Sequence, residues 1–124
     1  MIEAEDPPQF MIDGARVLRF AFLDASRGPY STVVNGMPVD GSIVTRLVIA
    51  EDLVEDGVYL LHCNRDWDTV AASHFGDAGD AQRSADSAYE SATPRWVEYR
   101  DLTDEEKRQV ETTRAFLKEL ASGG

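Results

Sequence analysis

Two histidines and a single cysteine are the side chains of this 124-residue sequence whose types suggest metal chemistry, because zinc prefers imidazole and thiolate ligands. These residues are His62, Cys63 and His74. In the β-hairpin that the surrounding residues predict, His62 lies opposite Thr69 and His74 lies opposite Gly57, which separates the two imidazoles by about 17 Å. Adjacent strand residues point to opposite faces, so His62 and Cys63 do not share a site. We therefore expect structural or surface roles for all three, and no metal.

Catalysis by a thiolate or by paired carboxylates is the second chemistry to consider. A catalytic cysteine needs a base on its own side and usually a helix N-terminus that lowers its pKa, and the sequence places neither beside Cys63. Glycosidases and magnesium-dependent phosphotransferases use two or three carboxylates. The candidate carboxylates here fall mostly at predicted strand ends, turns and a helix start, where acids are normal as caps. We therefore favour a protein that is not an enzyme and has no cofactor. The carboxylates considered are those of Asp52, Asp56, Asp66, Asp68, Asp77 and Asp80.

Phosphate binding is disfavoured by the glycine-containing segments. Gly28-Pro29 and the stretch from Gly76 to Gly79 lack the Lys, Ser or Thr that phosphates and magnesium require. Nucleic-acid binding needs a basic stripe, whereas the bases of this chain are scattered among acids. We expect no nucleotide and no nucleic-acid partner.

Acidic residues are concentrated in one part of the chain. Of the formal net charge of −11, the stretch from Leu47 to Gln82 carries −7, because it holds eight acids and one base, Arg65. A surface of one sign attracts cationic partners and repels nucleic acid and anionic lipid. Trp67, between two aspartates, is a candidate anchor for a partner. The predicted partner-binding residues are Asp52, Glu55, Asp56, Asp66, Trp67 and Asp68.

Length and composition indicate one domain with a working core, since the chain has 124 residues and 43% hydrophobic content. A lone cysteine forms no internal disulfide, which fits a reducing compartment. The acidic start lacks the positive charge and apolar run of a signal peptide. No apolar run approaches the roughly 20 residues that span a bilayer. We expect a cytoplasmic protein with no membrane partner; the sequence leaves its oligomeric state open.

The periodicity of apolar residues predicts an α+β fold. We expect a mainly antiparallel sheet of four to five strands and two helices in the order β-β-β-β-α-β-α, with both helices on one face and the other face left to water or a partner. Residues 1–13 are expected to form a frayed acidic arm, 14–124 a single domain, and 24–41 a long loop with a short strand at 32–34. The predicted strands span 16–23, 42–50, 58–64, 67–75 and 95–99, and the helices 77–92 and 104–121.

Within these elements, particular residues are expected to face the core. Leu18, Phe20 and Phe22 fall on one strand face at period two. Thr103 and Glu106 form a capping box before the last helix. The helix stripes comprise Ala81, Ala85, Ala88, Tyr89 and Ala92 in the first helix, and Val110, Thr113, Phe116, Leu117 and Leu120 in the second.

The run from Tyr59 to Ser73 (Y-L-L-H-C-N-R-D-W-D-T-V-A-A-S), followed by an alanine-spaced helix, resembles small bacterial proteins of the toxin-immunity type. The order of hairpin and helix is also similar to the partial RNase H-like domain of HicB-type antitoxins. The resemblance implies a protein partner such as a toxin and carries over no catalytic residue.

Two hypotheses follow from the sequence. The leading one is a non-enzymatic, acidic binding protein of the immunity or inhibitor type, which masks a basic partner surface by presenting carboxylates in place of phosphates. The competing interpretation within the same class is that the acidic residues only keep the protein soluble. The alternative class is a small-ligand-binding or enzymatic α+β domain with a pocket under the 24–41 loop.

Overall fold

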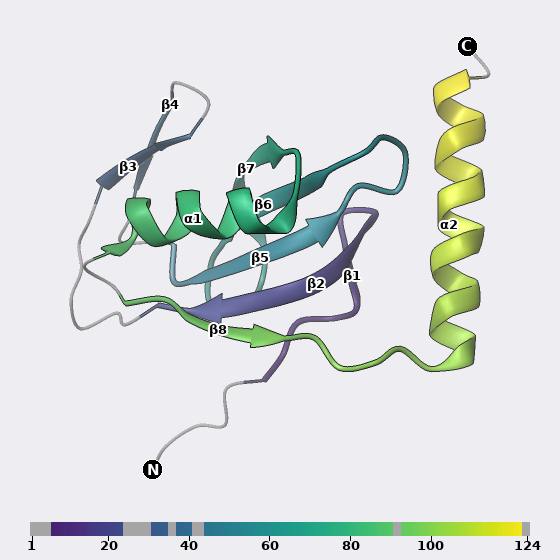
Figure 1. Cartoon of the computed structure of the whole chain (residues 1–124), viewed down its shortest axis with the longest axis horizontal. Coiled ribbons are helices and arrows are strands. Elements are labelled where there is room, and N and C mark those ends of the chain that lie inside the picture. Colours follow the sequence, from purple (N-terminus) through teal and green to yellow (C-terminus); the bar gives the residue numbers. More distant parts are fainter. Residues whose placement is uncertain (1–5, 24–30, 35–36, 41–43, 91–92, 123–124) are drawn as a thin grey trace.

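The computed structural model describes residues 6–23, 31–34, 37–40, 44–90 and 93–122, with backbone alone for 31–34 and 37–40. Its main sheet has the order β1-β2-β5-β6-β7, and every pair is antiparallel (Figure 1). A further strand, β8, pairs with the second half of β2. The strands of this sheet are β1 (Met11–Ile12), β2 (Ala15–Phe22), β5 (Arg46–Glu51), β6 (Val58–Cys63), β7 (Thr69–Phe75) and β8 (Arg95–Glu98).

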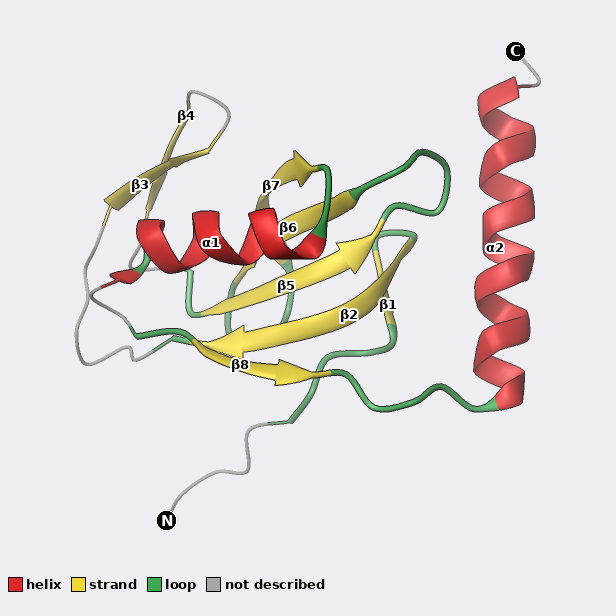
Figure 2. Ribbon diagram, in the orientation of Figure 1, coloured by secondary structure: helices red, strands yellow, loops and turns green. Residues whose placement is uncertain are grey.

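Two helices and a separate hairpin complete the fold, which confirms the predicted α+β class. The hairpin joins β3 (Ser31–Val34) to β4 (Met37–Asp40), so the segment expected to be mostly loop holds two paired strands. Helix α1 (Ala78–Ala88) lies across one face of the sheet, and α2 (Asp104–Ser122) stands beyond the end of the sheet (Figure 2). The expectation that both helices lie on one face of the sheet was therefore wrong.

A β-bulge in β2 changes which of its residues share a face. The register with β5 shifts between Val17 and Arg19. One extra residue reverses the alternation beyond it. Leu18 consequently packs toward α1, whereas Val17, Phe20 and Phe22 pack together on the opposite face. The predicted face of Leu18, Phe20 and Phe22 was wrong for Leu18 because period two fails at a bulge.

The turn between β6 and β7 is longer than predicted, and this moves both histidines. Strand β7 begins at Thr69, not Trp67, so His62 lies opposite Ala71 and His74 lies opposite Tyr59. Asn64 stabilises the longer turn, since its side-chain oxygen accepts hydrogen bonds from the backbone nitrogens of residues 66 and 68 at 2.9 and 3.0 Å. The predicted strands 58–64 and 67–75 left only residues 65 and 66 for the turn, and this prediction was wrong.

Helix α1 covers the first face of the sheet with small residues, as its alanine spacing predicted. Asp77 caps it by accepting a hydrogen bond from the backbone nitrogen of Asp80 at 2.8 Å. Ala81, Ala85 and Tyr89 are fully buried against the sheet. Small side chains let the helix approach closely enough for the Tyr89 hydroxyl to reach His62 on β6.

His62 is a buried histidine with one hydrogen-bonded ring nitrogen. Its Nδ1 lies 2.6 Å from the Tyr89 hydroxyl, whereas Nε2 is buried with no partner among the described residues. Burial lowers the pKa of His62 from 6.5 to about 4, because the charged imidazole loses its solvation. The native protein thus keeps this side chain neutral.

This pKa predicts acid sensitivity. Below pH 6.5 the unfolded chain takes up a proton at His62 that the native state excludes until about pH 4. The contribution of neutral His62 to the free energy of unfolding is complete above pH 6.5. It is lost as the pH falls to 4, which lowers the free energy of unfolding by about 3 kcal/mol. Urea denaturation at several pH values should show a weaker pH dependence for His62→Gln than for the native sequence in this window. An equal change in the free energy of unfolding with pH for the two proteins would contradict this prediction.

The second face of the sheet is covered by the segment that precedes β1. Pro8 is buried, its carbonyl accepts a hydrogen bond from the Tyr99 hydroxyl at 2.9 Å, and the carbonyl of Asp6 accepts one from Trp67 Nε1 at 3.2 Å. Residues 6–12 therefore pack on the sheet, which differs from the frayed arm that the acidic, proline-bearing sequence suggested; residues 1–5 lie outside the described residues. This segment therefore covers part of the face that we expected to be open.

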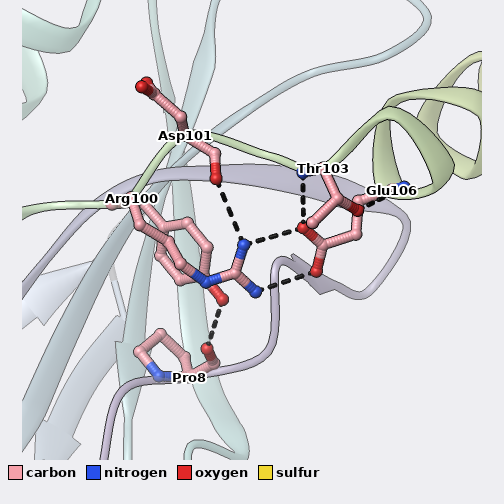
Figure 3. Close-up of polar contacts among 6 residues, drawn as sticks. Pro8, Arg100, Asp101, Thr103 and Glu106 are labelled. Atoms are coloured by element: carbon pink, nitrogen blue, oxygen red, sulfur yellow. Dashed lines mark hydrogen bonds and ion pairs between the residues drawn. The ribbon is translucent and has the colours of Figure 1, made fainter.

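Helix α2 begins at the predicted capping box. The backbone nitrogen of Thr103 donates to Glu106 Oε1 at 2.9 Å, and that of Glu106 donates to Thr103 Oγ1 at 3.1 Å. Arg100 adds two hydrogen bonds to the same carboxylate at 2.7 and 2.8 Å (Figure 3). The bond from Arg100 is the main reason that the pKa of Glu106 is lowered to about 2. Together these bonds fix the connection between β8 and α2.

The rest of α2 contacts the sheet only in part. Val110 is buried, and a Cβ at Gly14 would lie 3.4 Å from Leu117 Cδ1. Phe116 and Leu120 are 59% and 62% exposed, so the predicted apolar stripe is not a core face along its whole length. Within the described residues, no helix combines the length and apolar composition that crossing a membrane requires.

Candidate functional site

The predicted partner-binding residues lie at the two ends of β6. Asp52, Glu55 and Asp56 belong to the connection between β5 and β6, whereas the group from Asp66 to Asp68 forms the turn between β6 and β7. Six strand residues separate the groups, which corresponds to about 20 Å. The fold therefore forms two acidic regions from residues that the sequence suggested as one surface.

The turn residues line a groove, which we call the acidic groove. Its volume is about 420 Å³, and it lies between the segment before β2 and the turn between β6 and β7. Three of its wall residues are acids and none is a base. The walls are formed by Pro7, Pro8, Gln9, Met11, Ile12, Asp13, Asp66, Trp67, Asp68 and Thr69.

Asp13 is the acidic groove residue that the sequence reasoning missed. It begins the two-residue turn between β1 and β2, where Asp13 and Gly14 have φ values of 54° and 78°. Two successive positive φ values are typical of a type I′ hairpin turn, for which Asp-Gly is a favoured pair. That dipeptide was the available signal. The turn places an exposed carboxylate across from Asp66 and Asp68.

Trp67 forms part of the core as well as the groove wall. Its ring centroid lies 5.7 Å from those of Phe20 and Phe22, in edge-on contact, and the Arg46 guanidinium lies 4.9 Å above its ring. The backbone of Trp67 has a φ of 65°, which this buried aromatic packing must hold in place. The indole is therefore half-buried by the protein's own side chains, and only part of it faces the groove.

A second hollow, the apolar cavity, lies beside the acidic groove. It has a volume of about 320 Å³ and shares Ile12 and Asp13 with the groove, so the two spaces are neighbours. Asp52 and Tyr59 are its other polar wall residues. The remaining walls are formed by Gly14, Ala15, Leu53, Val54, Leu61, Ala72 and Leu117.

Asp52 holds the connection between β5 and β6 in place. Its side chain is buried and accepts hydrogen bonds from the backbone nitrogens of Val54 at 2.9 Å and Glu55 at 3.1 Å. Its other oxygen lies 3.2 Å from His74 Nε2. Burial by itself raises the pKa of Asp52, but these bonds and one from Tyr59 outweigh it and lower the pKa below 3.8. Asp52 is thus a structural residue, while Glu55 and Asp56 are exposed.

Gly57 ends this connection at a position that only glycine fits. Its φ is 116°, and a Cβ there would lie 2.5 Å from the Phe75 carbonyl oxygen and 2.6 Å from His74 Cε1. Its carbonyl accepts the backbone N–H of Asp52 at 3.1 Å. The close approach lets the connection fold back onto β7 and present Glu55 and Asp56 from a fixed backbone.

The histidines and the cysteine do not form a reactive centre in the described part of the chain. His62 faces α1, whereas His74 lies beside Tyr59, with ring centroids 5.1 Å apart. Burial raises the pKa of Cys63 to about 12, so its thiol is protonated at neutral pH. Among the described residues, no three side chains of His, Cys, Asp or Glu lie close enough together to hold a metal ion.

Comparisons with models of protein families, with curated proteins and with solved structures found no match for this chain. The functional conclusion therefore depends on the site itself.

The network of Asp52 makes a prediction about stability. Asp52→Ala leaves two backbone N–H groups and His74 without their acceptor, so we expect a loss of about 2 to 4 kcal/mol in the free energy of unfolding. Asp56→Ala, an exposed neighbour in the same connection, should change it by less than about 0.5 kcal/mol. Urea denaturation measures both. Equal effects of the two substitutions would show that Asp52 does not hold the connection.

Proposed function

We propose that this protein is a non-enzymatic binding protein that takes a basic segment of another protein into the acidic groove. The observation that carries the proposal is the wall of that groove, where Asp13, Asp66 and Asp68 meet with no basic side chain among the lining residues. Three carboxylates around one hollow attract a guanidinium or ammonium group, and charge complementarity of this kind raises the association rate.

The groove is built from fixed parts, which favours binding. Hydrogen bonds from Asn64 and the packing of Trp67 hold the turn at one wall, and the type I′ turn holds Asp13 at the other. A site that is ordered before binding loses less conformational entropy on association. The neighbouring apolar cavity offers room for an aliphatic side chain next to the basic residue of a partner.

Glu55 and Asp56 extend this acidic surface at the far end of β6. Both are exposed and both belong to the connection that Asp52 holds. Charges at such a distance from the groove steer an approaching partner more than they contribute to the final affinity. An inhibitor that masks the basic surface of a toxin fits this arrangement, in agreement with the immunity-type resemblance of the sequence.

The alternative of a ligand pocket under the 24–41 loop depends on side chains outside the described residues. The two hollows described above lie at the other end of β2, near its first residue, Ala15. Acidity that serves solubility alone predicts that binding of a basic peptide depends on net charge and not on the position of the acids. Titration of position-matched variants with a basic peptide separates the solubility interpretation from the proposal.

Binding of a blocked hexa-arginine peptide tests the acidic groove. The double substitution Asp66→Asn and Asp68→Asn should weaken binding about tenfold at low salt, because two carboxylates leave the groove. The matched control, Glu90→Gln with Glu119→Gln, removes two exposed acids that lie outside the groove walls. It should weaken binding less than about twofold. Isothermal titration at two salt concentrations measures each affinity.

The outcomes of this titration are distinguishable. If both double variants lose the same affinity, the peptide responds only to net charge and the solubility reading stands. If the groove variant loses affinity while the control keeps it, the groove is the binding site. Thermal unfolding of both variants verifies that the fold is intact.

A further inference from the structure

A second charged hollow has more bases than acids in its walls and is not part of the proposed partner site. This basic cavity has a volume of about 490 Å³ and lies along β2, between the end of β8 and the start of α2. Four of its wall residues are bases and two are acids, in a chain whose net charge is −11. The walls are formed by Arg16, Val17, Leu18, Arg19, Glu98, Tyr99, Arg100, Asp101, Leu102 and Lys107.

Two of the basic side chains have donors that the described contacts do not use. The Arg16 guanidinium lies 3.6 Å from Glu51, which is too long for a hydrogen bond, so its terminal nitrogens are not used, whereas its Nε is buried without a partner. The same Glu51 oxygen also lies 3.6 Å from Arg114, so one carboxylate faces two guanidinium groups. Lys107 is exposed and forms no ion pair among the described residues. Positive charge therefore remains available at this wall.

The other two bases are held in place by their partners. Arg19 donates to Gln82 at 2.7 Å and pairs with Glu98 at 3.2 Å, and its Nε has no partner. Arg100 is fixed by its two bonds to Glu106, as Figure 3 shows. These contacts give the cavity a rigid frame beside the two less constrained bases, Arg16 and Lys107.

From this geometry we propose that the basic cavity binds the phosphate group of a small phosphorylated molecule. Arginine matches a phosphate because its planar guanidinium donates two parallel hydrogen bonds, and lysine adds a mobile point charge. Arg16 and Lys107 supply these contacts, while Arg19 and Arg100, each paired with a carboxylate, frame the cavity. The acidic remainder of the protein repels large polyanions, so a small ligand fits better than a nucleic acid.

The other walls of the basic cavity indicate what accompanies the phosphate. Leu18, Tyr99 and Leu102 contribute apolar surface next to the bases. A hollow of about 490 Å³ is within the range of small-molecule sites and much larger than an inorganic phosphate needs. The ligand is therefore a small phosphate ester whose body contacts these side chains in a hollow with a mainly polar lining.

Titration with phenyl phosphate, inorganic phosphate and benzoate tests the proposal. Amide chemical shifts of the 124-residue chain, recorded at constant ionic strength, report binding at residues 16–19 and 98–107. Phenyl phosphate should bind at least about fivefold more tightly than inorganic phosphate, because its ring adds apolar contact. It should also bind at least about fivefold more tightly than benzoate, which lacks the second negative charge and the phosphate geometry.

Substitutions in the basic cavity identify the donors. Arg16→Gln and Lys107→Gln should each weaken phenyl phosphate binding about fivefold. The control, Arg108→Gln, removes an exposed base of α2 outside the cavity walls and should change the affinity less than about twofold. Lys107 is exposed, so its variant remains informative if Arg16→Gln lowers stability.

Three results would overturn the proposal. They are an absence of saturable shifts at the cavity residues, equal affinity for benzoate and phenyl phosphate, and an equal loss of affinity in Arg108→Gln and Lys107→Gln. The hexa-arginine experiment involves different residues, so failure of either proposal leaves the other unaffected.

Discussion

Both faces of the main sheet are apolar, and in the described part of the chain one helix lies across the sheet and covers only one of them. Helix α1 protects one face, on which Leu47, Ile49 and Leu60 are buried. The opposite face is protected by the segment before β1, by Trp67 and by Tyr99. Two hydrogen bonds to backbone carbonyls of this segment keep it on the sheet. The acidic groove and the apolar cavity exist because that segment crosses the face without filling it.

Electrostatics divides the molecule into two parts with different chemistry. The acidic groove and the connection that Asp52 holds present exposed acids at the two ends of β6, whereas the bases of Arg16, Arg19, Arg100 and Lys107 meet along β2, between the end of β8 and the start of α2. Charges separated by more than about 10 Å are screened at ordinary salt, so each hollow responds to its own lining. A protein with a large net negative charge can therefore hold a local site for an anion.

Buried polar groups explain why the two ends of β6 differ. At one end Asp52 is buried with its hydrogen bonds satisfied, which fixes the exposed Glu55 and Asp56. At the other end the acids themselves are exposed and the turn is held by Asn64 and Trp67. Among the six residues that the sequence predicted to bind a partner, Asp52 and Trp67 thus stabilise the structure. Charge counting alone does not separate a buried carboxylate from an exposed one.

The sequence was sufficient to predict the fold class, the alanine stripe of α1 and the capping box at Thr103 and Glu106, because each is indicated by residue types and their spacing within single elements. Tertiary structure decided the rest. The bulge in β2 and the longer turn before Thr69 moved Leu18 and both histidines from their expected neighbours. Both charged hollows join segments more than 50 residues apart, such as Asp13 with Asp66 and Arg16 with Lys107. Periodicity describes one element at a time, whereas such sites depend on how distant elements pack.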